Sequence, residues 1–328
     1  MADQRDRATY EVDGHTITAL TATPTGPARK PLIAALHGGT YTARYFDVAG
    51  APEGSFLDTA AAHGHPVVAF DRPGYGGSTP LAPDANTFDR HAALLAGALE
   101  QAAQRLGAHG VFLVGHSIGG MIALTIAATR PDLPLIGVSA TGMGAVIPSG
   151  GAAEALGSLP PDDTVDLPHE GREQVMFGPA HTYRAEGLRQ ARESYAPVPV
   201  RELIQAPAWP REQLAGIAPR VRVPVHNALA EFDALWDSGP ADVARFAALF
   251  TAAPFVDASV ARGTGHCIDH HLLGHALHLR QLAFAEECAV WAAGEAGDAA
   301  EAADHAAQAA GDAAEAAARP GTGTGTGR

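Results

Sequence analysis

The sequence predicts an α/β protein in which a mostly parallel central sheet is covered by helices on both faces. Short apolar runs that are typical of buried strands alternate with longer helical patterns along most of the chain. The apolar run 111–114 also leads through a glycine-rich turn directly into a helical stretch. With 328 residues, 46% of them apolar and 18% charged, the chain is long enough for one large α/β domain with an insertion, or for two domains.

Local patterns place the elements of the first part of the core, residues 1–142. Segments 8–12 and 16–23 alternate around Asp13–Gly14, which predicts a hairpin whose antiparallel strands extend one edge of the sheet. Ser55 is a candidate N-cap for the first helix. Buried strands are expected at 31–36, 66–70, 111–114 and 135–139, and helices from Ser55 to about Gly64, at 88–106 and at 121–130.

The alternation breaks between residues 143 and 220, where prolines and scattered charges replace the buried strands. We expect a helical cap, or lid, inserted after the strand at 135–139 and lying over the carboxyl edge of the sheet. The second part of the core, 221–293, resumes with strands at 221–230 and 255–260 and a closing helix at 268–291. Residues 294–328 are rich in Ala, Gly, Asp and Glu, which predicts a disordered tail or a fraying helix.

The net charge of the chain disfavours some classes of binding partner. The net charge is −14, from 22 basic and 36 acidic residues, which argues against nucleic acid and anionic membranes as partners. The expected partner is a small-molecule substrate. Two cysteines, Cys267 and Cys288, give no disulfide framework, and the first seven residues lack the apolar core of a signal peptide. No run approaches membrane-spanning length, so the expected location is the cytoplasm. These features leave the oligomeric state open.

The stretch Gly115-His116-Ser117-Ile118-Gly119 carries the strongest chemical signal. A serine at the apex of a sharp strand-to-helix turn has a strained backbone, so the residues two before and two after it must be nearly free of side chain. The turn lifts the Ser117 hydroxyl clear of the sheet. Ile118 heads the following helix, so its N–H is expected to point to where an oxyanion would form.

A serine hydroxyl needs a base to become a nucleophile, and the base needs an acid to orient it. In this topology both belong on loops after later strands, in the chain order serine, acid, histidine. The strand that ends at residue 230 is followed by Glu231 and Asp233, and the next strand is followed by His266. Glu231 is the alternative acid, although it lies nearer the end of its strand.

In these segments the sequence resembles the α/β hydrolases. The resemblance covers residues 8 to about 292 apart from the insertion, and its motifs follow one another in the order that the fold requires. They are His37-Gly38-Gly39, Asp71-Arg72-Pro73-Gly74-Tyr75-Gly76-Gly77-Ser78, Gly115-His116-Ser117-Ile118-Gly119, Glu231-Phe232-Asp233 and Gly265-His266.

The resemblance implies a role for each of these residues. Ser117 would be the nucleophile, His266 the general base and then acid, and Asp233 the carboxylate that orients it. The N–H of Gly39, with Thr40 as the alternative, would join that of Ile118 in the oxyanion hole.

Other residues of these loops are given supporting roles. His37 is expected to be structural, and Asp71 and Arg72 to fix the loop 71–78 by hydrogen bonds. No cofactor is implied.

A serine in place of the aspartate used by the epoxide- and halide-processing branches of this fold predicts acyl chemistry on an ester, thioester, lactone, amide or carbon–carbon bond. A carboxylesterase-like hydrolase of a small or medium ester-like substrate is the leading hypothesis. The alternatives are an acyltransferase or cyclase, a lyase that uses His266 as a base, and a non-catalytic binding protein. The pocket is expected to include Thr40, Met143 and Trp236, together with Met176, Phe177, Tyr183 and Trp209 of the insertion.

A histidine-rich stretch follows the candidate base. His271 and His275 are four apart, so on a helix they could share a metal ion, but no cysteine or carboxylate pattern completes such a site. We therefore expect His270, His271, His275 and His278 to pack or form hydrogen bonds, and we expect no metal. Cys267 is interpreted as a small loop residue rather than a second nucleophile.

Overall fold

The computed structural model describes residues 6–26, 30–48, 55–148 and 160–318, with side chains in the last range as far as residue 297. Its core is an eight-stranded sheet in which β2 runs antiparallel to both of its neighbours and every other pair is parallel. The predicted mostly parallel sheet with an antiparallel edge is therefore confirmed. In spatial order the strands are β1 (Asp6–Val12), β2 (His15–Ala22), β4 (Val67–Phe70), β3 (Leu32–Leu36), β5 (Val111–His116), β6 (Leu135–Thr141), β9 (Val225–Phe232) and β10 (Val256–Gly265).

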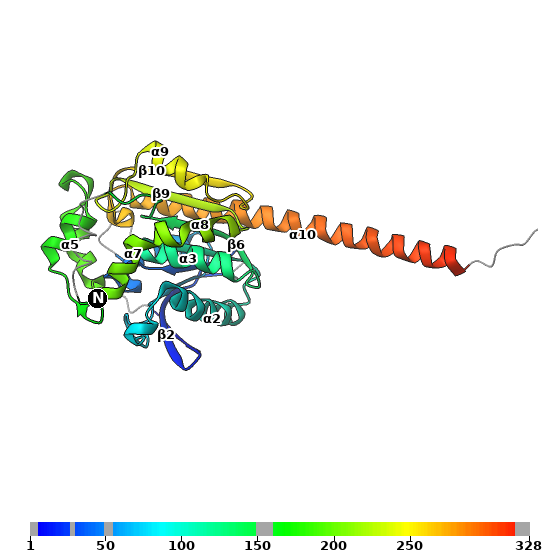
Figure 1. The fold of residues 1–328 in the computed structure, drawn as a ribbon, viewed down its shortest axis with the longest axis horizontal. Helices are drawn as coiled ribbons and strands as arrows, with labels where there is room; N and C mark the ends of the chain where they lie inside the picture. Colours follow the sequence, from blue (N-terminus) through cyan, green and yellow to red (C-terminus); the bar gives the residue numbers. More distant parts are fainter. Residues whose placement is uncertain (1–5, 27–29, 49–54, 149–159, 319–328) are drawn as a thin grey trace, which may run out of the picture.

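Helices cover both faces of this sheet, as the sequence predicts (Figure 1). Two buried clusters, one on each face, form the core. The first joins the sheet to α2 (Phe88–Leu106), α3 (Ile118–Thr129), α8 (Leu214–Ile217) and α9 (Pro240–Ala247). The second joins it to α1 (Phe56–Ala62) and to the first part of α10 (Gly274–Ala318).

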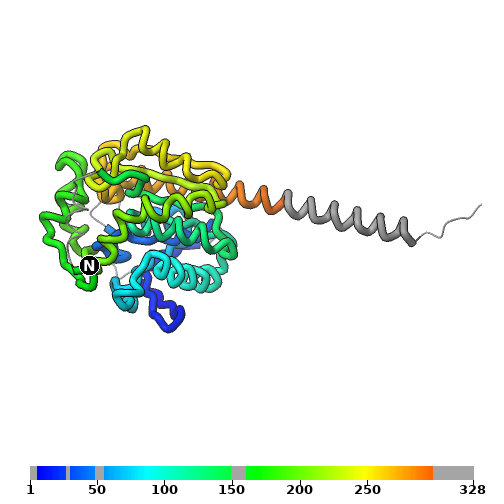
Figure 2. The backbone as a smooth tube through the Cα atoms, in the orientation of Figure 1, coloured from blue at the N-terminus to red at the C-terminus, as the bar shows by residue number. Residues whose placement is uncertain are grey.

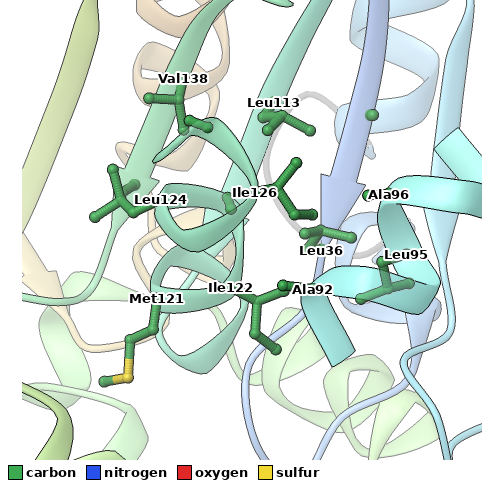
Figure 3. Close-up of a cluster of buried hydrophobic side chains, with 14 of the residues drawn as sticks. Leu36, Ala92, Leu95, Ala96, Leu113, Met121, Ile122, Leu124, Ile126 and Val138 are labelled. Atoms are coloured by element: carbon green, nitrogen blue, oxygen red, sulfur yellow. The ribbon is translucent and has the colours of Figure 1, made fainter. Parts of the chain in front are cut away.

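The central strands are buried on both faces, which explains why they consist of continuous apolar residues instead of an alternating pattern. Every residue of β3 and β5 is buried. Figure 3 shows Leu36 of β3 and Leu113 of β5 packed under Ile122 and Ile126 of α3, with Leu95 of α2 beside them. This packing fixes α3 against β3 and β5, and it therefore keeps the turn between β5 and α3 rigid.

The segment between β6 and β9 adds no strand to the main sheet in its described part, residues 160–220, which we call the inserted segment. In Figure 2 the first part of the inserted segment, drawn in green, lies at the end of the body opposite to the end where α10 leaves it, and Figure 1 shows α7 (Val200–Glu212) and α8 running back beside α3. Residues 149–159 of the expected cap lie outside the described residues. The elements of the inserted segment are β7 (Thr164–Val165), α5 (His169–Met176), η3 (Ala180–Thr182), α6 (Ala185–Ala191), η4 (Arg192–Ser194), β8 (Val198–Pro199), α7, α8 and η5 (Ala218–Arg220).

The C-terminal elements are longer than the sequence predicts. The strand expected at 255–260 continues to Gly265 through an irregularity after Ala261, and so carries the chain up to His266. The expected closing helix is divided into η6 (Ile268–His270) and α10, which continues as a helix to Ala318, beyond residue 294. Residues 319–328 of the expected tail lie outside the described residues. Among the described residues, no helix is long and apolar enough to span a bilayer.

Two further short helices lie in loops that follow strands of the sheet. They are η1 (Ala43–Phe46), which follows the loop after β3, and η2 (Pro83–Ala85), which precedes α2. The backbone N–H of Thr42, just before η1, donates to the carbonyl of Ser194 in the inserted segment at 2.8 Å. The loop after β3 is thereby joined directly to the inserted segment.

Candidate active site

The turn between β5 and α3 has the strained geometry that its sequence predicts. Ser117, the single residue between the two elements, has φ 53° and ψ −120°. A Cβ on Gly115 would lie 2.4 Å from the carbonyl oxygen of Gly119, and one on Gly119 would lie 2.0 Å from that of Leu36. Both contacts are too short for any side chain. The two glycines therefore allow the close approach that lifts Ser117 out of the sheet.

The loop after β3 lies directly against this turn. A Cβ on Gly39 would lie 3.0 Å from Cδ1 of Ile118, and both residues line the same cavity as Ser117. Ile118 is the first residue of α3, so its N–H is not used by the hydrogen bonds of the helix. Thr40, the alternative to Gly39, has φ 67° and a buried hydroxyl. These positions fit an oxyanion hole formed from two loops.

The side chain of Arg72 fixes this loop by hydrogen bonds to its carbonyl groups. It is fully buried, and its Nε and Nη2 donate to the carbonyls of His37 and Gly38 at 3.0 and 3.1 Å. Burial is the largest single influence on Arg72 and lowers its pKa, but the charge of Glu202, its hydrogen bond and the neighbouring Tyr75 together leave the pKa raised. The Glu202 carboxylate lies 2.8 Å from Nη2 and also accepts the hydroxyl of Tyr75 at 3.0 Å. Since Glu202 belongs to α7, one buried ion pair joins the loop to the inserted segment.

The hydrogen bonds of His37 and Asp71 support the structural roles expected of them. Burial and the charge of Arg72 lower the pKa of His37 well below its usual value, so its Nε2 is free to accept the backbone N–H of Arg72 at 3.1 Å. Asp71 accepts the N–H of Ala43 at 2.8 Å and the hydroxyl of Thr18 at 2.7 Å. These bonds fix the loop 71–78 to β2 and η1.

The structure brings the predicted acid and base together. Nδ1 of His266 lies 2.9 and 3.1 Å from the two carboxylate oxygens of Asp233, and both side chains are buried. Asp233 also accepts the N–H groups of Leu235 and Trp236 at 2.9 and 3.2 Å, which holds its carboxylate in place. The Nε2 of His266 is buried and has no hydrogen-bond partner among the described residues.

The position of His266 relative to the serine follows from the ring of His116, the residue before Ser117. The two histidine rings lie 5.0 Å apart between their centroids. No hydrogen bond between Ser117 and His266 forms among the described residues, and such bonds commonly tighten only when substrate binds. Burial and the neighbouring His266 lower the pKa of His116 well below its usual value, so it adds no positive charge beside the base.

Glu231, the alternative acid, and Cys267 each interact with a residue other than His266. Glu231 is exposed, and its carboxylate accepts the N–H of Gly263 at 2.7 Å, away from His266. Burial raises the pKa of the Cys267 thiol far above its usual value, and the hydroxyl of Tyr41 lies 3.1 Å from Sγ. A buried, protonated thiol is a poor nucleophile. The geometry therefore favours Asp233 as the acid and Ser117 as the nucleophile.

The histidine-rich stretch is used in hydrogen bonds to its own surroundings. His271 accepts the N–H of Gly265 at 2.9 Å, and burial lowers its pKa to about 4. His270 bonds to the carbonyl of Tyr45 at 2.9 Å, and His278 lies 3.2 Å from the carboxylate of Asp269. Among the described residues, no group of three His, Cys, Asp or Glu side chains is arranged to hold a metal ion.

A cavity of about 320 Å³ lies between the Ser117 turn and the inserted segment. Thr40, Met176 and Trp236 line it, as expected. Met143 does not: it is fully buried in the core beneath α3, where its Sδ lies 3.1 Å from the position of a Cβ on Gly120. Phe177, Tyr183 and Trp209 are also absent from the described lining, because Phe177 and Tyr183 pack on each other and Trp209 is buried in the core.

Apart from Met176, the residues of the wall that the inserted segment provides were not predicted from the sequence. On α5 and its N-cap the wall consists of residues that recur with helical spacing, and on α7 of three apolar residues with the same spacing. They are the N-cap Pro168 with Gly171, Arg172, Val175 and Met176, and Leu203, Ala206 and Pro207. Such a face can be recognised only once the helix bounds are known, because no motif marks it.

Comparisons with known proteins agree with this topology. A sequence profile described as alpha/beta hydrolase fold matches residues 31–143. No curated protein matches the chain.

Three solved structures illustrate the likeness. An esterase from Thermogutta terrifontis is 22% identical, with a TM-score of 0.57 over 85% of this chain and 99% of the esterase. The N-acyl homoserine lactonase AidH is 16% identical, with a TM-score of 0.62 over 86% and 98%. The thioesterase domain from the curacin biosynthetic pathway is 18% identical, with a TM-score of 0.59 over 85% and 100%. At these identities the likeness shows the fold.

Proposed function

We propose that this chain, which has the α/β-hydrolase fold, is a serine hydrolase that cleaves a small or medium ester-like substrate. The observation that carries the proposal is the buried pair of His266 and Asp233 beside a strained serine that opens on a cavity. Each of these features is costly to a fold, and together they form the arrangement that activates a hydroxyl.

In the proposed reaction the Ser117 oxygen attacks the carbonyl carbon of the substrate, and Nε2 of His266 takes the hydroxyl proton. Asp233, bonded to Nδ1, holds the ring in the tautomer whose Nε2 can accept that proton and stabilises the imidazolium that forms. The imidazolium then gives its proton to the leaving alcohol, thiol or amine, which departs and leaves an acyl group on Ser117. A water molecule, deprotonated by His266, then attacks the acyl carbon, and the imidazolium returns its proton to the Ser117 oxygen as the bond to the acyl group breaks and the acid leaves.

The negative charge that develops on the substrate oxygen needs donors that are already in place. The N–H groups of Ile118 and Gly39 are our candidates, since both residues line the cavity beside Ser117. One such donor is worth roughly 10²–10³-fold in kcat in comparable enzymes. The hydrogen bonds from Arg72 to the loop carbonyls of His37 and Gly38 keep the loop from moving as the charge forms.

The cavity supports the size of the substrate. At about 320 Å³ it falls at the lower end of the range for small-molecule sites, and its lining is mostly apolar. The similar structures include an esterase, a lactonase and a thioesterase, so the bond is open among esters, thioesters and lactones.

Turnover of matched panels of ester, thioester, lactone and amide substrates tests the proposal. We expect hydrolysis of at least one of the first three classes, and loss of that activity in Ser117→Ala together with loss of labelling by a fluorophosphonate. Thermal unfolding of the variant serves as the control for folding. Labelling or turnover that persists in Ser117→Ala would show that another residue is the nucleophile.

A further inference from the structure

One basic side chain interrupts the apolar wall of the cavity. Of the described residues that line it, Arg172 is the one with a charged side chain. It lies on the face of α5 that Gly171, Val175 and Met176 also present to the cavity. Its neighbour Glu173 lies on another face, where it pairs with Arg192. Arg172 therefore brings a basic side chain to this wall, without a carboxylate from α5 beside it.

Arg172 is buried without the hydrogen bonds that burial normally requires. Only 2% of the residue is exposed. Nη2 donates to Asp166 at 3.3 Å, and the guanidinium carbon lies 4.2 Å above the ring of Tyr195. Nε and Nη1 have no hydrogen-bond partner among the described residues. Burying such donors unpaired is costly, so a group that accepts from them would be bound strongly.

The one carboxylate paired with Arg172 among the described residues is a weak partner. The side chain of Asp166 is 72% exposed and contributes a single, long hydrogen bond. Its charge is therefore screened by water, whereas that of Arg172 is not. Arg172 thus keeps most of its positive charge and two donors that are unpaired among the described residues, in a residue that lines an otherwise apolar cavity.

A second residue that lines the cavity also has a buried polar group without a hydrogen-bond partner among the described residues. This group is the Thr40 hydroxyl, and the carbonyl of Thr40 accepts the N–H of Ala196 at 2.9 Å. The next residue, Tyr41, pairs with Tyr195, the ring on which Arg172 lies. Backbone pairing thus connects the loop beside Ser117 to Tyr195, on whose ring the Arg172 guanidinium lies.

We propose that Arg172 determines specificity by binding a carboxylate on the substrate, so that the preferred substrate is an ester-like compound that also carries a free acid group. This inference rests on the proposed hydrolase function and names its substrate class. A guanidinium presents donors in a planar fork that fits the two oxygens of a carboxylate, and desolvation strengthens the pairing. The apolar remainder of the wall fits the hydrocarbon between the acid and the scissile bond.

Matched pairs of substrates test the inference. The mono-p-nitrophenyl esters of succinate, glutarate and adipate place a carboxylate on the acyl side, and p-nitrophenyl butyrate, valerate and hexanoate are their neutral counterparts. For the alcohol side, 4-acetoxybenzoate is compared with phenyl acetate. In at least one pair we expect kcat/KM to favour the charged substrate by roughly ten- to a hundred-fold.

Substitutions at Arg172 assign the preference to this side chain. Arg172→Met is expected to remove the preference, mainly by raising KM for the charged substrate. Arg172→Lys is expected to keep only part of it, because an ammonium group lacks the planar fork. Arg201→Met is the matched control, since Arg201 belongs to the same segment, does not line the cavity and pairs with Asp162 on the surface.

A binding measurement separates recognition from catalysis. Calorimetric titration of Ser117→Ala with the preferred charged ester should show binding that the additional change Arg172→Met weakens by a similar factor. If Arg172→Met fails to fold, the wild-type preference and the Arg172→Lys variant decide the matter.

The outcomes for the two proposals are distinct. Ser117-dependent hydrolysis without a preference for any charged substrate, or with a preference that survives Arg172→Met, overturns the role of Arg172 and leaves the hydrolase function standing. Turnover that persists in Ser117→Ala overturns the hydrolase function itself.

Discussion

Asp233 would act on the reaction entirely through the ring of His266. In Asp233→Asn the amide cannot stabilise the imidazolium and favours the wrong tautomer, so we expect kcat for a p-nitrophenyl ester to fall by about 10⁴-fold. Stopped-flow kinetics with a folding check by circular dichroism measures it. Glu231→Gln is the control and should change kcat only slightly, because Glu231 is exposed and bonds to Gly263. A larger loss in Glu231→Gln than in Asp233→Asn would exchange the two roles.

The residues whose roles depend on local backbone geometry could be predicted from the sequence. The spacing of Gly115 and Gly119 around Ser117 reflects a close approach of two backbone segments, and any chain that makes this turn must meet it. Asp233 and His266 could be placed because they follow predicted strands. Arg172 could not, since its importance comes from burial and from missing partners, neither of which has a sequence signature.

At the scale of elements, the ion pair between Arg72 and Glu202 couples the loop after β3 to α7. Glu202→Gln leaves the Arg72 charge buried without its counterion, which is expected to lower the free energy of unfolding by about 3–5 kcal/mol. Urea denaturation measures this change. We also expect kcat to fall, because Arg72 would no longer hold the carbonyls of His37 and Gly38.

An exposed ion pair of the same segment provides the comparison. Asp162→Asn removes the surface pair with Arg201, and at most about 1 kcal/mol of stability should be lost. Equal effects of Asp162→Asn and Glu202→Gln on stability would mean that the buried pair does not hold the loop.

The inserted segment is the part of the chain whose structure was least predictable from the sequence. Its aromatic residues suggested a pocket lining, but Phe177 packs against Tyr183 and His271 instead. The cavity wall is formed by small and aliphatic side chains such as Ala206 and Pro207 on α7. Which face of a short helix meets the cavity depends on tertiary packing, and periodicity over seven or eight residues does not determine it.

For the whole molecule, the alternation of buried strands and helices was sufficient to predict the sheet. Parallel strands buried on both faces require continuous apolar runs, and β3, β4 and β5 are of this kind. The ends of the last strand and helix were less predictable. Arg262 and Gly263 interrupt the apolar pattern of β10, although pairing with β9 carries the strand on to Gly265.

Buried histidines should make the stability of the whole protein depend on pH. Burial is the main cause that lowers the pKa of both His226 and His271 to about 4. In the unfolded chain a histidine titrates near pH 6.5, so between about pH 4 and 6.5 the unfolded state binds more protons. The free energy of unfolding should therefore rise with pH across this window, by up to about 1.4 kcal/mol per pH unit for each group.

Urea denaturation between pH 4.5 and 7.5 measures this dependence. His226→Gln removes one titrating group and should reduce the slope. A free energy of unfolding that stays constant from pH 4.5 to 6.5 would show that these histidines are not held neutral in the folded protein.

The proposed reaction passes through an acyl group on Ser117. This step is tested most directly by mass spectrometry of the protein quenched with acid during turnover of an ester that it hydrolyses. We expect the intact mass to increase by the acyl group, the modified peptide to contain Ser117, and both signals to disappear in Ser117→Ala. Turnover without any adduct that continues undiminished in Ser117→Ala would show that Ser117 is not the nucleophile.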